Sequence, residues 1–173
     1  MKKLLSMLLI CVMVISMGCI TTFAESDIPS DLPEGTVKIA EGIYMYTPAE
    51  SDVMPLNSLD WVTIPTVPAY GTIVQPSSLS NIIVGTSDNY ICIQSSASIR
   101  INLVRNNTSI FGTNIGNWPK IGGSTTTTYY IEADYYNINK GVAYQMQCTS
   151  ANTAKSNVRV RYFTDPDKSD FLD

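Results

Sequence analysis

The stretch YYIEADYY, residues 129–136, holds the side chains with the clearest capacity for chemistry at a surface. If it forms a β-strand, successive side chains point to opposite faces. The face expected at the surface then presents Tyr130, Glu132, Asp134 and Tyr136. The face expected in the core presents Tyr129, Ile131, Ala133 and Tyr135. Two carboxylates two positions apart on a strand are separated by about 7 Å, within the range of the paired acids that hydrolyse glycosides.

Three interpretations of this face are open. Tyrosine rings stack on the apolar faces of sugars while carboxylates accept hydroxyl hydrogen bonds, so Tyr130, Glu132, Asp134 and Tyr136 could form a platform for a glycan or peptide. The string E-A-D also resembles the start of the ExDxxE signature of a glucanase family, which implies glycoside hydrolysis, although Asn137 occupies the position of that family's second catalytic Glu. Ordinary cross-strand pairing, for which Tyr and Thr are suited, requires no ligand.

Other catalytic chemistry has little support in the composition. The chain contains no histidine, so Ser–His and Cys–His nucleophile pairs and the commonest zinc ligand are missing. Neither GxGxxG nor GxxxxGK(S/T) occurs, and Cys92 and Cys148 are too far apart for a CxxC pair. The acids of DPDKSD, residues 165–170, resemble a calcium loop but lack its Gly and distal Glu. We therefore expect a non-enzymatic protein without cofactor or metal.

The elements that must position these residues are short strands. From Leu59 onward, β-branched and aromatic runs alternate with Gly, Asn, Pro or Ser: DWVTIPTV, GTIVQP, NIIVG, YICIQ, SIRINLV, TSIFG, TTTTYYIEADYY, GVAYQMQC and NVRVRYF. In SIRINLV, Ile99, Ile101 and Leu103 share one face, as period two requires. RNNT at 105–108 and NINKG at 137–141 predict tight turns. We expect an all-β fold, a single antiparallel β-sandwich of about seven to nine strands, immunoglobulin-like or jelly-roll-like, with a barrel as the alternative.

The cysteines bear on the same architecture. Once a leader is removed, Cys92 and Cys148 are the two that remain, and an even pair in an exported chain predicts a disulfide, with two buried thiols as the alternative. Each lies in a strand-like run, with Trp118 between them. This spacing resembles the inter-sheet pair of immunoglobulin-type domains. Trp118 lies in the turn-like GNWPK, and Tyr144 stands four residues before Cys148, where that family has a tyrosine two before.

The N-terminus predicts export. Lys2 and Lys3 precede an apolar run from Leu4 to about Ile15, too short to span a bilayer but typical of a secretory signal peptide. Cleavage after Ala24 would release a secreted chain. Cys19 resembles the lipid-attachment cysteine of bacterial lipoproteins, with Ser16 where that motif has an aliphatic residue, so a lipid anchor is the alternative.

Charge divides the exported chain into three parts. Residues 25–58 form an acidic leader containing Pro and Gly, with one or two short strands expected in VKIAEGIYMYTP. Residues 59–164 form the sandwich domain, and residues 165–173 an acidic tail. Beyond residue 24 the chain has 15 acidic and 9 basic residues, a net charge of −6. No basic stripe suited to phosphates is present, which argues against nucleic acid as a partner.

Two functions follow from this organisation. The first is a secreted or surface-associated binding or adhesion module for an unknown extracellular glycan or protein, without a transmembrane helix. The alternative is a self-associating or membrane-acting effector, indicated by the Ser/Thr-rich GGSTTTTYY and by edge strands that could pair with another chain. A small glycoside hydrolase is a third hypothesis, and the oligomeric state is left open.

Overall fold

The chain folds into an all-β structure built from two antiparallel sheets, here described from a computed structural model over residues 28–49 and 61–164. These residues contain no α-helix. The strands are β1 (Val37–Ala40), β2 (Ile43–Tyr46), β3 (Val62–Val67), β4 (Ile82–Ile83), β5 (Tyr90–Ser95), β6 (Ile99–Arg105), β7 (Thr108–Ser109), β8 (Lys120–Ile121), β9 (Ser124–Glu132), β10 (Ala143–Thr149) and β11 (Lys155–Phe163). Two 3-10 turns, η3 (Ser77–Leu79) and η4 (Ile115–Asn117), lie in the connections. The all-β prediction is confirmed.

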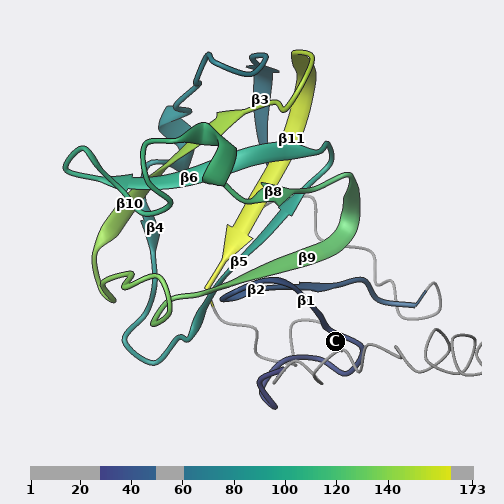
Figure 1. The fold of residues 1–173 in the computed structure, drawn as a ribbon, viewed down its shortest axis with the longest axis vertical. Coiled ribbons are helices and arrows are strands. Elements are labelled where there is room, and N and C mark those ends of the chain that lie inside the picture. The colour runs from purple at the N-terminus through teal and green to yellow at the C-terminus, as the bar shows by residue number, and fades with distance from the viewer. Residues whose placement is uncertain (1–27, 50–60, 165–173) are drawn as a thin grey trace, which may run out of the picture.

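The larger sheet contains six strands in the order β1-β2-β9-β5-β11-β3. Its central strand β9 pairs with β2 through Tyr44↔Tyr130 and with β5 through Cys92↔Tyr130. The hairpin β1–β2, although it lies in the predicted leader, is therefore part of this sheet. Figure 1 shows this hairpin alongside β9 at the lower end of the molecule, far in sequence from its neighbour.

The smaller sheet contains five strands and is built around β6. It runs β4-β10-β6-β7, and β8 pairs with β6 beside β7. The pairing Cys148↔Ile101 sets the register of β10 on β6, so that the apolar faces of both strands coincide. This register agrees with the period-two pattern in both sequences.

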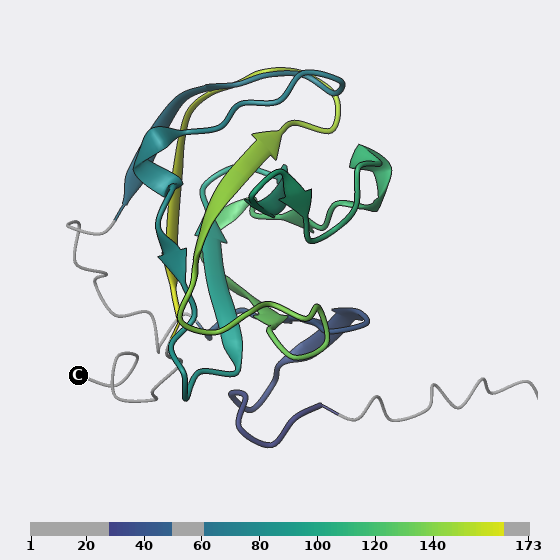
Figure 2. The ribbon, with the colours of Figure 1, turned by 90° about the vertical axis from the view of Figure 1, so that its left-hand side faces the viewer.

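One core lies between the two sheets. Ile91, Ile93 and Ile131 come from the larger sheet, and Ile101 and Met146 from the smaller one, all with no exposed surface. Figure 2, at right angles to Figure 1, shows the strands curving around this shared core. Apolar burial of this kind stabilises by about 25 cal/mol per Å² and is the main force that holds two sheets face to face.

Both predicted turns are confirmed by backbone geometry. Asn106 and Asn107, between β6 and β7, have φ of 48° and 62°. Positive φ at both central positions belongs to the hairpin turn whose twist matches paired strands, and Asn tolerates it better than most residues. Gly141 has φ of 75°, in the left-handed region that glycine adopts at low cost.

The described residues contain eleven strands, of which β1 and β2 lie in the predicted leader, and β4 and β7 lie in the predicted runs NIIVG and TSIFG. The strand that no predicted run covers is β8, which is only two residues long. Hydrophobic periodicity needs more residues than that to be visible. In contrast, GTIVQP forms no strand. It contributes a single bridge between Val74 and Cys148, because Pro76 lacks the N–H that a ladder would need.

The predicted disulfide is wrong, because Cys92 and Cys148 face different compartments. On β5, Ile91 and Ile93 point into the core between the sheets, so Cys92 points to the opposite face of the larger sheet. Cys148 points into the core between the sheets. A sheet thus separates the two thiols, and no disulfide joins them. Burial raises the pKa of the Cys148 thiol to about 12.

The immunoglobulin resemblance loses its cysteine bridge and keeps only the two facing sheets. Trp118, which the sequence places in the turn-like GNWPK, ends the short turn η4. Its indole is buried and donates a 2.9 Å hydrogen bond to the Gly112 carbonyl. It therefore anchors the loop between β7 and β8 to the core.

Several predictions fall outside the described residues. These are the signal peptide at 1–24, the lipid-attachment alternative at Cys19, the domain boundary near residue 58, and the acidic tail at 165–173. None of the described residues belongs to a helix long and apolar enough to cross a membrane.

Candidate functional site

The predicted site in YYIEADYY is divided by the end of β9. The strand stops at Glu132, and the chain turns, with the Ile138 N–H bonded to the Ala133 carbonyl at 2.8 Å. Asn137 takes a φ of 53°, which a strand cannot accommodate. Alternation therefore holds for Tyr129, Ile131 and Ala133, which are buried in the core as expected, and fails beyond them.

Beyond the end of β9, the burial of Tyr135 and Tyr136 is the reverse of that predicted. Tyr136, expected at the surface, is half-buried against the main core, with its ring 4.8 Å from that of Phe111. Tyr135, expected in the core, is 51% exposed. The single-strand geometry on which the glycosidase hypothesis rested is also absent, because Asp134 lies in the turn while Glu132 ends the strand.

Tyr130, also expected at the surface, is completely buried. It lies on the outer face of the larger sheet, the face turned away from the smaller sheet, in a group we term the outer cluster: Leu32, Tyr44, Tyr90, Cys92 and Tyr130. The Tyr44 and Tyr130 rings both meet the Tyr90 ring edge to face, at centroid distances of 6.4 and 6.0 Å. Leu32 belongs to the predicted leader, so part of that leader is packed on the sheet.

Two carboxylates accept hydrogen bonds from this cluster. Tyr44 donates to Glu132 at 3.3 Å, and Tyr90 donates to Asp31 at 3.0 Å. Burial, with these carboxylates as a second cause, raises the pKa of both Tyr44 and Tyr90. Burial also raises the pKa of Tyr130, whose hydroxyl has no hydrogen-bond partner among the described residues. All three stay protonated near neutral pH, which suits packing and not proton transfer.

The exposed part of the predicted stretch forms a different surface, the Tyr135 patch: Lys38, Glu41, Asp134, Tyr135 and Lys140. The Tyr135 ring packs on the backbone of Gly42, where an added Cβ would lie 2.5 Å from Cδ1 of Tyr135. Its other neighbour is the Tyr136 ring, edge to face at 4.9 Å. A half-exposed ring is thus held from two sides.

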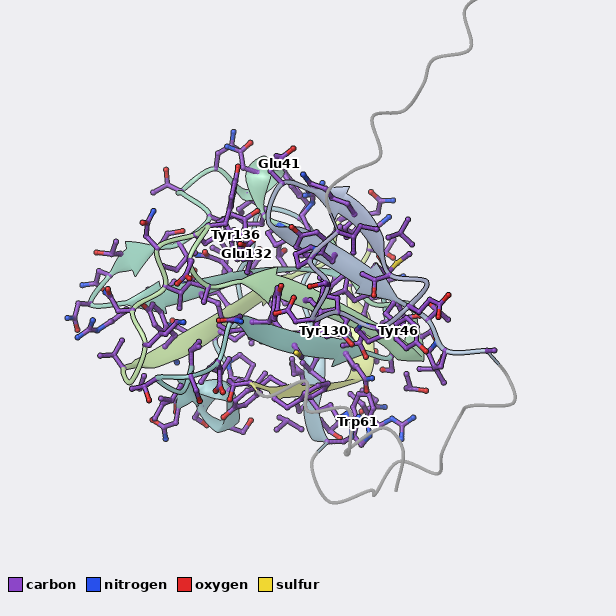
Figure 3. The ribbon with its side chains drawn as sticks, turned by 90° about the horizontal axis from the view of Figure 1, so that it is seen from below. Glu41, Tyr46, Trp61, Tyr130, Glu132 and Tyr136 are labelled. Atoms are coloured by element: carbon purple, nitrogen blue, oxygen red, sulfur yellow. The ribbon has the colours of Figure 1, made fainter. Side chains whose placement is uncertain are left out.

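The connection between Tyr135 and the hairpin is fixed by Tyr136. The Tyr136 hydroxyl donates a 2.7 Å hydrogen bond to the Glu41 carbonyl, in the turn between β1 and β2. Figure 3 shows Glu41 near one side of the molecule, with Tyr136 and Glu132 between it and the middle, whereas Trp61 lies toward the opposite side. Burial raises the pKa of Tyr136 to about 12, so the hydroxyl keeps its proton.

Both carboxylates of the Tyr135 patch are paired with lysines. Lys38 Nζ lies 2.8 Å from Glu41 Oε2, and Lys140 Nζ lies 3.7 Å from Asp134 Oδ1. The hydrogen bond to Glu41 raises the pKa of Lys38. The patch is electrically neutral as a whole, yet the Glu41 and Asp134 side chains are 69% and 76% exposed. Their oxygens can accept further hydrogen bonds from a ligand.

The predicted site shares only Asp134 with the Tyr135 patch, and the other four residues of the patch were not singled out from the sequence. Tyr135 was assigned to the core, and Lys38 and Glu41 lie more than 90 positions away on the hairpin. The Glu41-Gly42 dipeptide is a turn signal, but a turn does not reveal its tertiary neighbour. Within residues 28–49 and 61–164, no group of three His, Cys, Asp or Glu side chains could hold a metal ion.

Comparison of the chain with family models, with curated proteins and with solved structures finds no match.

Proposed function

We propose that this protein is a secreted, non-enzymatic binding module that recognises a neutral glycan through the Tyr135 patch. The observation that carries the proposal is the half-exposed Tyr135 ring, held by Gly42 and Tyr136 between two exposed carboxylates. A large aromatic side chain usually buries most of its surface, so a pre-positioned exposed ring is suited to a ligand.

The chemistry of the patch favours a sugar. The apolar face of a hexose can stack on the ring while its hydroxyls donate to Glu41 and Asp134. Because each carboxylate has a lysine partner, the patch attracts neither cations nor anions strongly. A neutral glycan therefore fits better than a charged peptide.

Secretion and the detailed topology belong to the same proposal. The basic and apolar order of residues 2–15, with small residues before Glu25, supports cleavage and release, and a lipid at Cys19 is the alternative. The two facing antiparallel sheets support a sandwich of immunoglobulin-like or jelly-roll-like type, an architecture common among extracellular binding modules.

The test is a glycan-array screen followed by titration calorimetry of the hits. We expect Tyr135→Ala to weaken binding at least tenfold, since burying one large apolar side chain contributes about 1.5–3 kcal/mol. Tyr70→Ala is the matched control, because Tyr70 is 53% exposed and lies in the loop after β3. Equal affinity of the wild type and Tyr135→Ala, or equal loss in both variants, would remove the patch from the function.

Self-association is a second candidate function, favoured by the edge strand β1. This strand has β2 as its one neighbour among the described residues, and Val37 and Ile39 on it are 51% and 43% exposed. An exposed apolar edge can pair with a second chain. We expect sedimentation to detect oligomers at high concentration, and Ile39→Lys to abolish them. A monomer at all concentrations would exclude this candidate, and dye release from liposomes would indicate membrane action instead.

A further inference from the structure

At the opposite edge of the larger sheet, two arginines stack on one tryptophan. The guanidinium carbons of Arg159 and Arg161 lie 5.4 and 5.5 Å from the ring centroid of Trp61. We term this group the arginine–tryptophan stack. Both arginines are on β11, where they alternate with Val158 and Val160. The two valines point into the core, so Arg159 and Arg161 point to the outer face.

Strand register and hydrogen bonds hold the stack in place. Val160 pairs with Val62, so Trp61, immediately before β3, lies beside the arginines of β11. Arg161 Nε donates a 2.8 Å hydrogen bond to Gln94 Oε1, and its guanidinium also lies 5.3 Å from the Phe163 ring centroid. Gln94 is itself fixed by a 2.7 Å hydrogen bond to Thr128, so the orientation of Arg161 is set by three neighbouring strands.

Arg159 supplies the exposed charge. It lies on the surface, and none of the carboxylates in the described residues forms an ion pair with it. A guanidinium that lies on an indole face keeps its N–H edge directed outward, where it can bind a carboxylate through two parallel hydrogen bonds. The stack thus pre-orders a side chain that is usually mobile, which reduces the entropic cost of binding.

We propose that the arginine–tryptophan stack binds the carboxylate of an acidic sugar in an oligosaccharide. The planar carboxylate matches the guanidinium edge of Arg159, and the sugar ring can contact the exposed part of Trp61. An anionic bilayer or a nucleic acid is a poorer match, because each requires several basic residues to offset the net charge of −6 that the chain carries beyond residue 24. This site is separate from the Tyr135 patch and does not depend on it.

The test uses trigalacturonic acid as the probe and its methyl ester as the matched uncharged ligand. The readout is tryptophan fluorescence, since the chain has two tryptophans and Trp118 is only 3% exposed. We expect quenching by the acid and none by the ester. We expect Arg159→Gln to weaken the affinity at least tenfold, Arg159→Lys to give an intermediate loss, and Arg105→Gln, on the other sheet, to cause no change.

Each contrary outcome overturns the proposal. Three results would show that no carboxylate binds here. The first is no quenching at a probe concentration of about 10 mM, which corresponds to a binding free energy weaker than about 2.7 kcal/mol. The others are equal quenching by acid and ester, and full affinity in Arg159→Gln. Binding to phosphatidylglycerol vesicles without binding to the sugar acid would assign the stack to membranes instead. Thermal unfolding of Arg159→Gln and Arg159→Lys separates lost binding from lost fold, and calorimetry provides a second readout.

Discussion

The hydroxyl of Tyr136 donates a 2.7 Å hydrogen bond to the backbone carbonyl of Glu41, 95 positions earlier in the chain. This bond joins the turn after β9 to the turn between β1 and β2. Both turns carry exposed carboxylates of the Tyr135 patch, so the bond fixes the distance between the two halves of the proposed binding surface.

Tyr136→Phe should therefore affect binding as well as stability. Loss of the hydroxyl should lower the free energy of unfolding by about 1 kcal/mol and weaken binding at the Tyr135 patch, because the two turns are no longer tied. Tyr162→Phe is the matched control, since the Tyr162 hydroxyl donates to the Asn81 carbonyl at 3.0 Å, away from the patch. Denaturant unfolding and calorimetry measure both effects. Similar glycan affinity in the two variants would contradict the positioning role.

Gly42→Ala should be more destabilising than Gly35→Ala. Both glycines have positive φ, 65° and 86°, so alanine is strained at either position. At Gly42 the new Cβ also meets the Tyr135 ring, whereas at Gly35 it meets nothing within 4 Å. We expect losses of about 1 kcal/mol for Gly35→Ala and about 2–3 kcal/mol for Gly42→Ala by denaturant unfolding. Equal losses would show that Tyr135 moves aside without cost.

Tyr→Phe variants in the outer cluster should show different changes in stability for a hydroxyl that is hydrogen-bonded and for one that is not. Tyr90→Phe removes the bond to Asp31 and should cost about 1–2 kcal/mol. Tyr130→Phe removes a buried hydroxyl without a partner in residues 28–49 and 61–164, and should raise the free energy of unfolding by about 1 kcal/mol, because the desolvation penalty of that hydroxyl is removed. Chemical denaturation of both variants is the measurement. A large loss in Tyr130→Phe would reveal an acceptor for that hydroxyl.

Alkaline pH should destabilise the protein through its buried tyrosines. Burial raises the pKa of Tyr44, Tyr90, Tyr130 and Tyr136 in the folded state above the ordinary value of 10.0. Above pH 10 the unfolded chain loses these protons while the folded chain retains them, so the free energy of unfolding falls as pH rises toward 12. Denaturant unfolding between pH 8 and about 12 measures the slope, which Tyr90→Phe should reduce. A flat profile would show that the buried tyrosines are more accessible to water than their packing indicates.

Cys92 and Cys148 should both be present as thiols. We expect the denatured chain, alkylated without reductant, to gain one label at Cys92 and one at Cys148. In the native protein Cys148 should react slowly, because a pKa of about 12 leaves about one thiolate in ten thousand at pH 8. Mass spectrometry after each treatment is the measurement. If the chain accepts these labels only after reduction, a disulfide is present, and Cys92 does not point to the outer face of the larger sheet as described.

Much of the fold could be predicted from local pattern. Period-two alternation correctly placed Ile99, Ile101 and Leu103 of β6 in the core, and the double asparagine at 106–107 correctly marked a turn. These features depend on a residue and its near neighbours, which the sequence lists in order. The two-residue strand β8 was not predicted, because two residues carry no period.

The candidate site was predicted only in part. The stretch 129–136 was singled out for its tyrosines and acids, but the end of β9 at Glu132 could not be placed, so Tyr135 and Tyr136 were assigned to the wrong faces. A strand ends where its partners end, and the partners of β9 are β2 and β5, distant in the chain. The arginine–tryptophan stack likewise depends on the pairing of β11 with β3.

By itself the amino-acid sequence determined that this chain is built from strands and which residues of each strand share an apolar face. It also excluded nucleophile pairs that need histidine, because the chain has none. Only the tertiary structure decided that Cys92 and Cys148 face opposite sides of a sheet, that Tyr130 is buried, and that Gly42 lies against the Tyr135 ring. The physical reason is that alternation defines two faces of a strand but not which face meets the core. That choice is made by the partners, whose register and packing are non-local.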